Sequence, residues 1–415
     1  MFDLTEMGKN AKAAAKKLAV ASTADKNRAL LSMAQALDDN CDDILAANAI
    51  DIENGEKSGM RPSLLDRLRL TKERVAGLSQ GVREVSQLPD PCGEIISGGV
   101  GYKGLDIKCV RVPLGVCGII CEARPNVISD AAALCFKSGN ACIIRGGSSA
   151  INSNAAIAKV LRKALSDEGF DENCVQVIVD ATRESATALM RLNGYLDGLI
   201  PRGGAGLIRS VVENSSVPVI ETGVGNCHVY VDDSADIDMA AEIIFNAKTS
   251  RPSVCNAIET ILIHKDIYEK ALPVIAEKLS TMNVEIRGDE RTKALLGDSI
   301  VPVTEEDYAT EFLDYILACR VVDSFDEALD HISKYSSGHS EAIVTASYEN
   351  ARRFTGEIDA AAVYVNASTR FTDGGIFGLG AEIGISTQKL HARGPMGLKQ
   401  LTSQKYIIQG NGQIR

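Results

Sequence analysis

The sequence predicts an α/β protein with two domains, each built on a parallel β-sheet. Short apolar runs alternate with helical segments along the chain, which is typical of βαβ units. A first series of strands is expected at 116–121, 141–145, 175–179, 196–200 and 217–220. A second series is expected at 228–231, 259–264, 283–286, 316–322, 341–345 and 361–365. The passage from one series to the next places a domain boundary near 223–226, and 415 residues are enough for two to three domains.

Helices are expected before and between these strands. Residues 5–88 carry apolar residues at helical spacing, with a capping box at Ser22-x-x-Asp25 and a further helix start at Pro62. The helices between strands are expected at 128–137, 150–165, 184–192, 205–213 and 238–249. The alternating stretch 95–113 predicts an extended hairpin outside the main sheet, and the tail from 399 is also strand-like.

Composition excludes several classes of protein. The formal net charge is −11 and no basic run occurs, which argues against a nucleic-acid or anionic-membrane partner. The N-terminal residues do not resemble a secretory signal and no apolar run is long enough to span a membrane, so we expect a cytoplasmic protein. The 11 cysteines are odd in number and lack a C-x-x-C pair, and the five histidines are scattered. We therefore expect neither a disulfide framework nor a structural metal.

Two glycine-rich loops between a strand and a helix are candidates for binding phosphate. They are RGGSSAINSN at 145–154, with Gly146, Gly147 and Ser148, and PRGGAGLIRS at 201–210, with Gly203 and Gly204. Glycine lets the backbone approach a ligand closely, and the amides at a helix N-terminus favour an anion. Neither loop has a G-x-G-x-x-G or Walker A pattern, so each is also compatible with a plain tight turn. Arg145 could pair with a ribose phosphate or simply be solvated.

Cys255, in SRPSVCNAIET, is the best candidate for a nucleophile. Pro252 and Ser253 interrupt the preceding helix, so the thiol is expected in a loop, whereas most other cysteines fall inside apolar strands or helices. The alternative is a small buried apolar residue. Asn126 and Glu221 each follow a strand, where an amide could donate to an oxyanion and a carboxylate could act as a base or cap a turn.

His331, His339 and Glu341 form a polar cluster around a glycine turn in DHISKYSSGHSEAIVT. A surface loop is the usual structure for such a composition.

Five segments carry a resemblance to a known family. The chain resembles the aldehyde dehydrogenase superfamily, and within it the reductases that act on glutamyl phosphate. The segments are 113–127, 218–232, 250–260, 328–343 and 378–398, of which the histidine-rich 328–343 is the most specific.

The resemblance implies an aldehyde dehydrogenase-like fold. A Rossmann-like NADPH-binding domain would take 1–95, 117–224 and 386–398, and an α/β catalytic domain would take 225–385. The hairpin at 96–116 and residues 399–415 would form an oligomerisation arm, so a homo-oligomer is implied.

The resemblance also implies the reaction, which is NADPH-dependent reduction of L-glutamyl 5-phosphate to L-glutamate 5-semialdehyde in proline biosynthesis, with release of phosphate. Cys255 would form a thioester, and the Cys255 amide and Asn126 would hold the oxyanion. Glu221 matches a general base of hydrolytic relatives, yet this reaction has no hydrolysis step, so its role stays open. Arg145 replaces a lysine that contacts the cofactor in other members of the superfamily, which is compatible with NADPH.

The substrate contacts and the partners are less specified. Arg124, Arg251 and Arg370 are candidates to bind the substrate, on charge alone. Glutamate 5-kinase, which makes the substrate, is implied as a transient partner. The alternatives are a different aldehyde dehydrogenase, which oxidises an aldehyde to an acid or an acyl-CoA, and an inactive ligand-binding relative.

Overall fold

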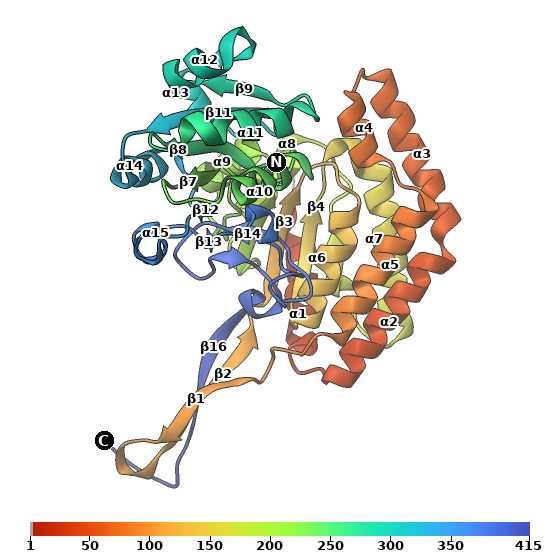
Figure 1. The fold of residues 1–415 in the computed structure, drawn as a ribbon. Coiled ribbons are helices and arrows are strands. Elements are labelled where there is room, and N and C mark those ends of the chain that lie inside the picture. Colours follow the sequence, from red (N-terminus) through yellow and green to blue (C-terminus); the bar gives the residue numbers. More distant parts are fainter. Residues whose placement is uncertain (1–2) are drawn as a thin grey trace. The chain divides into compact units, whose positions relative to one another are not determined.

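The computed structural model describes residues 3–415, which form two compact units (Figure 1). The first unit runs to Thr222 and also contains Gly378–Gly384 and Met396–Arg415. The second unit contains Gly223–Phe377 and Ile385–Pro395. The division near 223 follows the change between the two predicted series of strands. Ile385–Pro395 packs with the second unit, although the predicted nucleotide domain included 386–398.

Helices form the N-terminal part of the first unit. They are α1 (Thr5–Leu18), α2 (Thr23–Asp39), α3 (Cys41–Lys57), α4 (Pro62–Leu68) and α5 (Lys72–Gln87). Helix α2 begins where predicted, because the Ser22 hydroxyl accepts the Asp25 amide at 3.1 Å and donates to the Asp25 carboxylate at 2.6 Å. Pro62 is the first residue of α4, as its fixed φ favours.

A four-stranded parallel sheet forms the centre of the first unit, in the order β5-β4-β3-β6. The strands are β3 (Val116–Cys121), β4 (Ala141–Arg145), β5 (Val175–Val177) and β6 (Gly198–Arg202). The connecting helices are α6 (Asn126–Lys137), α7 (Ile151–Asp167), α8 (Arg183–Met190) and α9 (Ala205–Asn214). From β3 the chain adds β4 and then β5 on one side, and it then returns to add β6 on the other side of β3. The carboxyl ends of β3 and β6 therefore flank a topological switch point, where open α/β sheets bind ligands.

Helices cover both faces of this sheet. Apolar residues of α1, α8 and α9 share one buried cluster with residues of β3, β4 and β6. Helices α6 and α7 also contact the sheet, and α2, α3 and α5 pack on them. The predicted strand at 217–220 is the exception, because it forms only a single bridge between Val219 and Leu199.

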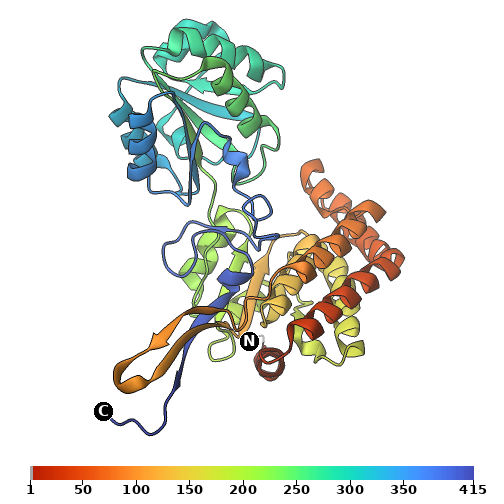
Figure 2. The same cartoon turned by 60° about the horizontal axis from the view of Figure 1, so that its bottom comes forward.

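A separate three-stranded antiparallel sheet belongs to the first unit and extends away from the rest of it (Figures 1 and 2). Its strands are β1 (Ile95–Val100), β2 (Asp106–Pro113) and β16 (Thr402–Gln409), with β2 in the middle. All residues of β1 and all but the first of β16 are exposed. The predicted hairpin and strand-like tail are therefore paired with each other, outside the main sheet.

The second unit is built on a seven-stranded parallel sheet, in the order β10-β9-β11-β8-β7-β12-β13. The strands are β7 (Cys227–Val231), β8 (Ile258–His264), β9 (Glu285–Gly288), β10 (Val301–Pro302), β11 (Ile316–Val322), β12 (Ser340–Val344) and β13 (Ala362–Val365). The helices are α10 (Ile237–Thr249), α11 (Tyr268–Ser280), α12 (Glu290–Leu296), α13 (Glu305–Tyr308), α14 (Phe325–Tyr335) and α15 (Tyr348–Glu357). Strands β14 (Ile385–Ser386) and β15 (Gly394–Pro395) form a small antiparallel pair.

The core of the second unit lies on both faces of its sheet. Helices α10 and α11 contribute to an apolar cluster on one face, and α14 and α15 to a cluster on the other. Every residue of β7, β8 and β12 is buried. A fully buried valine or isoleucine stabilises the fold by about 1.5–3 kcal/mol, so this core fixes the position of the loops at its edges.

Among the described residues, no helix combines the length and apolar character needed to cross a membrane.

Candidate active site

Cys255 lies in a turn of the second unit that joins α10 to β8. Helix α10 ends at Thr249 and β8 begins at Ile258, and the intervening backbone is closed by a hydrogen bond from the Ala257 amide to the Val254 carbonyl at 3.0 Å. Cys255, Cys41 and Cys92 are half-buried, whereas the other eight cysteines are buried. Burial raises the pKa of the Cys121 and Cys319 thiols to about 12, so those side chains stay protonated.

The backbone of Cys255 is packed against the segment that leads into β7. A β-carbon added to Gly225 would lie 1.6 Å from the Cys255 carbonyl oxygen and 2.4 Å from its α-carbon, so only glycine fits there. The Cys227 thiol donates to the same carbonyl at 3.2 Å, and the Gly225 amide donates to the Glu311 carboxylate at 2.7 Å. The turn is thus held by the segment that leads into β7.

Two predicted substrate-binding arginines lie close to Cys255. The charges of Arg251 and Cys255 both act on the Arg370 guanidinium, whose pKa is lowered by burial first and by Arg251 second. Arg370 also donates to the Ser250 hydroxyl at 2.9 Å and to the Asn256 side chain. The structure therefore brings Cys255, Arg251 and Arg370 together, and positive charge next to a thiol favours its thiolate form.

The predicted histidine-rich cluster is buried, so its interpretation as a surface loop is wrong. His331 is 3% exposed, and His339 and Glu341 are fully buried. Glu341 accepts from the His228 amide at 2.9 Å, contacts the His228 ring nitrogen Nδ1 at 3.0 Å and accepts from the Ser336 hydroxyl at 2.5 Å. The sheet overrides the local composition here, because β12 inserts Ser340–Val344 between β7 and β13.

Burial also perturbs these histidines. Desolvation lowers the pKa of His339 to about 4, and desolvation together with the charge of His228 lowers that of His331 to about 2. The Nε2 atoms of both rings are buried and have no hydrogen-bond partner. Both side chains are therefore neutral at physiological pH and belong to the core of the second unit.

We expect His339→Gln to reduce the loss of stability in acid. A histidine with a lowered pKa stabilises the fold above its unfolded pKa of about 6.5, and this contribution is lost as pH falls from there toward 4. Between pH 7.5 and 5.5 the loss for one such group is about 1.4 kcal/mol. The measurement is the free energy of unfolding at both pH values, with the exposed His391→Asn as the control. An equal pH dependence in wild type and His339→Gln would contradict the burial of a neutral ring.

Charged residues gather at the carboxyl edge of the sheet in the first unit. The pKa of Cys121, at the end of β3, is influenced by Arg202, Arg145, Glu122 and Arg124, so all four charges lie near this strand end. Arg145, at the end of β4, donates to the carbonyls of Ala181 and Thr182 at 3.0 and 3.2 Å, while its Nε atom is buried without a partner. Three guanidinium groups against one carboxylate make this edge suited to an anion.

The two helix N-termini that were expected to bind phosphate already carry carboxylates of the chain. Asp51 accepts from the Asn152 and Ser153 amides of α7 at 3.2 and 2.8 Å. Glu122 accepts the Gly204 amide at 2.6 Å, immediately before α9. The Asn152 and Ser153 amides lie downstream of Gly146, Gly147 and Ser148 in the segment 145–154.

The glycines in these loops are required by the protein's own packing. A β-carbon on Gly147 would lie 2.5 Å from the Ala123 amide nitrogen, and one on Gly203 would lie 2.7 Å from the Glu122 side chain. Whether the loops also contact a cofactor stays a prediction.

Asn126 and Glu221 lie in the first unit, and each follows a strand segment. Asn126 is the first residue of α6, is exposed, and donates through its side-chain amide to Asp130 at 3.1 Å. Burial raises the pKa of Asp130 to about 6. Glu221 is half-buried, between Ile220, which donates to Leu199 at 2.9 Å, and Thr222. The roles of Asn126 and Glu221 stay predictions.

Several residues that contact the predicted positions, in one unit or the other, were not predicted from the sequence. They are Asp51, Glu122, Asp130, Arg202, Gly225 and Glu311. The spacing of Asn126 and Asp130, four residues apart at a helix start, is a signal that could have revealed one of these pairs. The carboxylates of Asp51 and Glu122 act on distant loops, so no local pattern identifies them.

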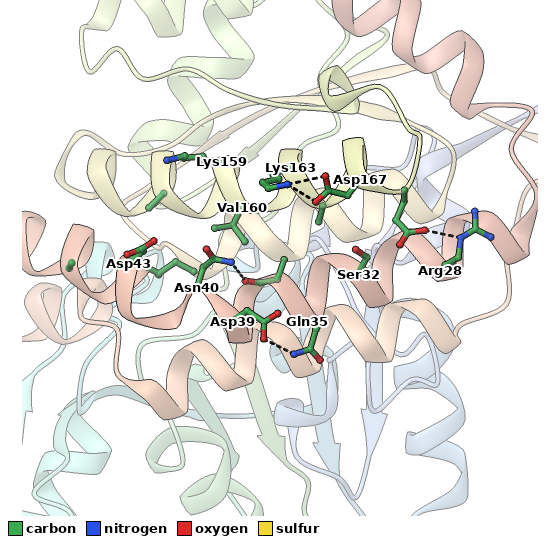
Figure 3. Close-up of a pocket in the computed structure, with 16 residues that line it drawn as sticks. Arg28, Ser32, Gln35, Asp39, Asn40, Asp43, Lys159, Val160, Lys163 and Asp167 are labelled. Carbon is green, nitrogen blue, oxygen red and sulfur yellow. Dashed lines mark hydrogen bonds and ion pairs between the residues drawn. The ribbon is translucent and has the colours of Figure 1, made fainter.

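Two further features lie outside the predicted site. Asp233, His264 and Asp266 place three potential metal ligands within 4.8 Å of one another, but both carboxylates are exposed and exposed acidic groups are common without an ion. The expectation of no structural metal stays a prediction. A groove of about 850 Å³ lies between α2, α3 and α7 (Figure 3), and no predicted site residue lines it. Its charged side chains are largely paired with one another, for example Lys163 with Asp167.

The fold and the comparisons with known proteins define an oxidoreductase class. A model of the aldehyde dehydrogenase family matches residues 3–315, and the chain belongs to this family. The predicted superfamily resemblance, the α/β fold class and the assignment as an enzyme are confirmed.

The more similar relatives share one name. The chain is 59% identical over 405 residues to γ-glutamyl phosphate reductase of Clostridium novyi, covering 98% of this chain and 97% of the relative. It is also 59% identical over 415 residues to γ-glutamyl phosphate reductase of Carboxydothermus hydrogenoformans, covering 100% of both chains. The crystal structure of γ-glutamyl phosphate reductase from Thermotoga maritima superimposes with a TM-score of 0.97 at 50% identity, covering 100% of both chains. The resemblance to this branch of the superfamily is thereby confirmed.

Proposed function

We propose that the chain reduces L-glutamyl 5-phosphate to L-glutamate 5-semialdehyde, with NADPH as the reductant and phosphate as the second product. The observation that carries this proposal is the half-buried Cys255 thiol, whose charge acts on the Arg370 guanidinium together with that of Arg251. The phosphate group of an acyl phosphate carries negative charge next to the acyl carbon that reacts. Positive charge near the nucleophile therefore attracts the substrate. The full-length relatives named γ-glutamyl phosphate reductase support the same substrate.

In the proposed mechanism, the Cys255 thiolate attacks the acyl carbon and the bond to the phosphate oxygen breaks. Phosphate leaves with that electron pair, and a thioester forms on Cys255. The cofactor supplies a hydride when it is bound. After the acyl carbon is reduced, the Cys255 sulfur leaves as a thiolate and the aldehyde is released.

Negative charge that develops on the acyl oxygen is stabilised by hydrogen-bond donors, and negative charge on the leaving phosphate is stabilised by cationic side chains. We propose the Cys255 amide and the Asn126 side chain as donors to the oxyanion, because fixed donors stabilise charge that develops in the transition state. The Asn126 amide carries two hydrogens and donates one to Asp130. Arg251 and Arg370 are proposed to stabilise the departing phosphate or the substrate carboxylate, and Arg124 is the third candidate.

Glu221 is proposed to have no part in activating water. Phosphate is already a good leaving group, and a water activated near the thioester would hydrolyse it and waste the substrate. Two roles fit this reaction, tuning of the thiol or support of the backbone between β6 and β7.

The carboxyl edge of the first unit's sheet fits a phosphate-bearing cofactor. The unpartnered buried Nε atom of Arg145 and the nearby charges of Arg124 and Arg202 favour an anion at this edge. We propose that Arg145 and the backbone of Gly146, Gly147 and Ser148 hold the adenosine phosphates, with Gly203 and Gly204 as the second loop.

We expect NADPH to be preferred over NADH, and Arg145→Ala to remove most of that preference. Loss of one charge-assisted hydrogen bond is worth about 1.5–3 kcal/mol, which corresponds to about 10- to 150-fold in kcat/KM for NADPH. The value for NADH should change much less. Arg183→Ala, at the exposed start of α8, is the matched control. Equal kcat/KM for both cofactors in the wild type would remove Arg145 as a phosphate ligand.

The reaction itself is tested in the reverse direction, from glutamate 5-semialdehyde, NADP⁺ and inorganic phosphate. We expect NADPH formation to require phosphate, because phosphate must attack the thioester to release the product. Omission of phosphate should abolish sustained turnover. Phosphate-independent turnover would indicate a hydrolytic aldehyde dehydrogenase, and dependence on coenzyme A would indicate an acyl-CoA-forming one.

The sheet formed by β1, β2 and β16 is proposed to mediate self-association. Both of its edge strands expose apolar side chains, among them Ile95 at 60%, Tyr406 at 65% and Ile408 at 59%. An exposed apolar edge strand is a template for pairing with another chain, and a second copy would cover it. A transient contact with glutamate 5-kinase and a cytoplasmic location stay predictions.

A further inference from the structure

A buried ion pair joins the two ends of the turn that carries Cys255. Lys248 lies in the last turn of α10 and Glu259 is the second residue of β8, so they stand on either side of the turn. Their Nζ and Oε2 atoms are 2.5 Å apart, and both side chains are fully buried. Lys248 also donates to the Ile258 carbonyl at 3.0 Å. The Lys248 side chain therefore ties the last turn of α10 directly to the first two residues of β8.

The pair is tied to the segment that approaches Cys255 from the other side. Glu259 accepts the Leu313 amide at 3.2 Å, and the centroid of the Phe312 ring lies 6.0 Å from the Lys248 Nζ atom. Two residues earlier along the chain, Glu311 accepts the amide of Gly225, whose backbone packs on Cys255. Leu313 has a positive φ of 56°, a strained conformation that this hydrogen bond helps to hold.

Burial of this pair opposes its charged state. Desolvation raises the pKa of Glu259 to about 7 and lowers that of Lys248, although the attraction between the two groups acts in the opposite direction. A buried ion pair is often no more stabilising than two apolar side chains of similar volume. The pair also constrains the orientation of the backbone around it, because hydrogen bonds depend on angle and apolar contacts do not.

We propose that Lys248 and Glu259 are positioning residues that set the geometry of the Cys255 turn. This inference rests on the proposed role of Cys255 as the nucleophile. The pair does not touch the reacting atoms. It acts by holding the ends of the turn so that the thiol and the Cys255 amide keep one orientation toward the acyl carbon.

The test replaces both partners at once, in Lys248→Met/Glu259→Gln, which conserves volume and keeps an acceptor for the Leu313 amide. We expect the melting temperature to change by no more than about 4 °C. Misplacement of a reacting group by a fraction of an ångström to 1 Å costs up to about 100-fold, so kcat should fall by about 10- to 100-fold with KM little changed. The rate of Cys255 alkylation by iodoacetamide, and its pH profile, should change as well. Glu259→Gln alone retains one acceptor oxygen and leaves Lys248 bonded to the Ile258 carbonyl, so it should recover part of kcat.

The matched control is Lys26→Met/Asp90→Asn, which removes a buried ion pair of the first unit whose Nζ and Oδ2 atoms are also 2.5 Å apart. This variant should leave the alkylation profile of Cys255 unchanged. A folded Lys248→Met/Glu259→Gln protein with wild-type kcat and alkylation would overturn the proposal. Failure of both Glu259 variants to fold would overturn it too, because the pair would then be a requirement of folding. Activity that survives in Cys255→Ala would instead contradict the proposed function. In that case, alkylation of Cys255 in the Lys248 and Glu259 variants would still test whether the pair positions the turn.

Discussion

Cys255→Ala is expected to lose turnover by roughly 10⁴-fold or more in both directions, because removal of a covalent nucleophile leaves no alternative route at comparable rate. Alanine fits the half-buried position without a cavity of consequence, and the fold should be retained. The measurement is kcat for NADPH formation from the semialdehyde, NADP⁺ and phosphate, together with a melting curve.

The control for this loss is Cys41→Ala, which removes another half-buried thiol, near the start of α3. It should keep wild-type kcat. A second readout separates chemistry from binding, since Cys255→Ala should still bind NADPH with the wild-type Kd. Cys255→Ala protein with near wild-type turnover would exclude the thioester mechanism, and another group would have to carry the acyl chain.

Much of the fold was predictable because its strands are fully buried. In parallel sheets covered on both faces, strands such as VCGIIC and ACIIR become short continuous apolar runs, which stand out between amphipathic helices. Periodicity failed where the structure depends on distant partners. The run at 217–220 has the composition of a strand, yet it forms only the bridge between Val219 and Leu199.

The candidate site was predictable in part, and for a different reason. Cys255 was identified by Pro252 and Ser253, which interrupt the helix before it, and local sequence carries that signal. The clustering of Arg251 and Arg370 around it depends on a segment more than 100 residues away in the chain. Charge alone made Arg370 a candidate, and its hydrogen bonds to the Ser250 and Asn256 side chains show how it is held.

The buried polar groups were the least predictable. His339 and Glu341 stand in a serine- and glycine-rich stretch whose composition is that of a loop, but the sheet places them in the core. Such residues are tolerated there because most of their polar atoms find partners, as Glu341 does with His228 and Ser336. A pattern of residue types contains no information on whether those partners exist. Lys248 and Glu259 illustrate the same limit, since charged residues 11 positions apart are usually solvated.

Gly225→Ala is expected to cause the second largest loss of activity, by about 100-fold or more, since its β-carbon would occupy the space of the Cys255 backbone. The nearest atom would be the Cys255 carbonyl oxygen at 1.6 Å, and backbone cannot move aside as the end of a flexible side chain can. The Cys255 turn must therefore shift, or the hydrogen bond between the Gly225 amide and Glu311 must break. The measurement is kcat together with the rate of Cys255 alkylation, and both should fall.

Two other glycines of the second unit give a graded comparison. In Gly223→Ala the β-carbon would meet the Thr387 side chain at 2.3 Å, which can rotate, so the loss should be smaller. In Gly356→Ala the β-carbon would meet nothing within 4 Å, and alanine in helix α15 should stabilise the protein by about 0.5–1 kcal/mol with kcat unchanged. The expected order of kcat is Gly356→Ala, then Gly223→Ala, then Gly225→Ala. Wild-type kcat in Gly225→Ala would mean that catalysis tolerates a displaced Cys255 turn, and the close packing of Gly225 on Cys255 would then have no catalytic role.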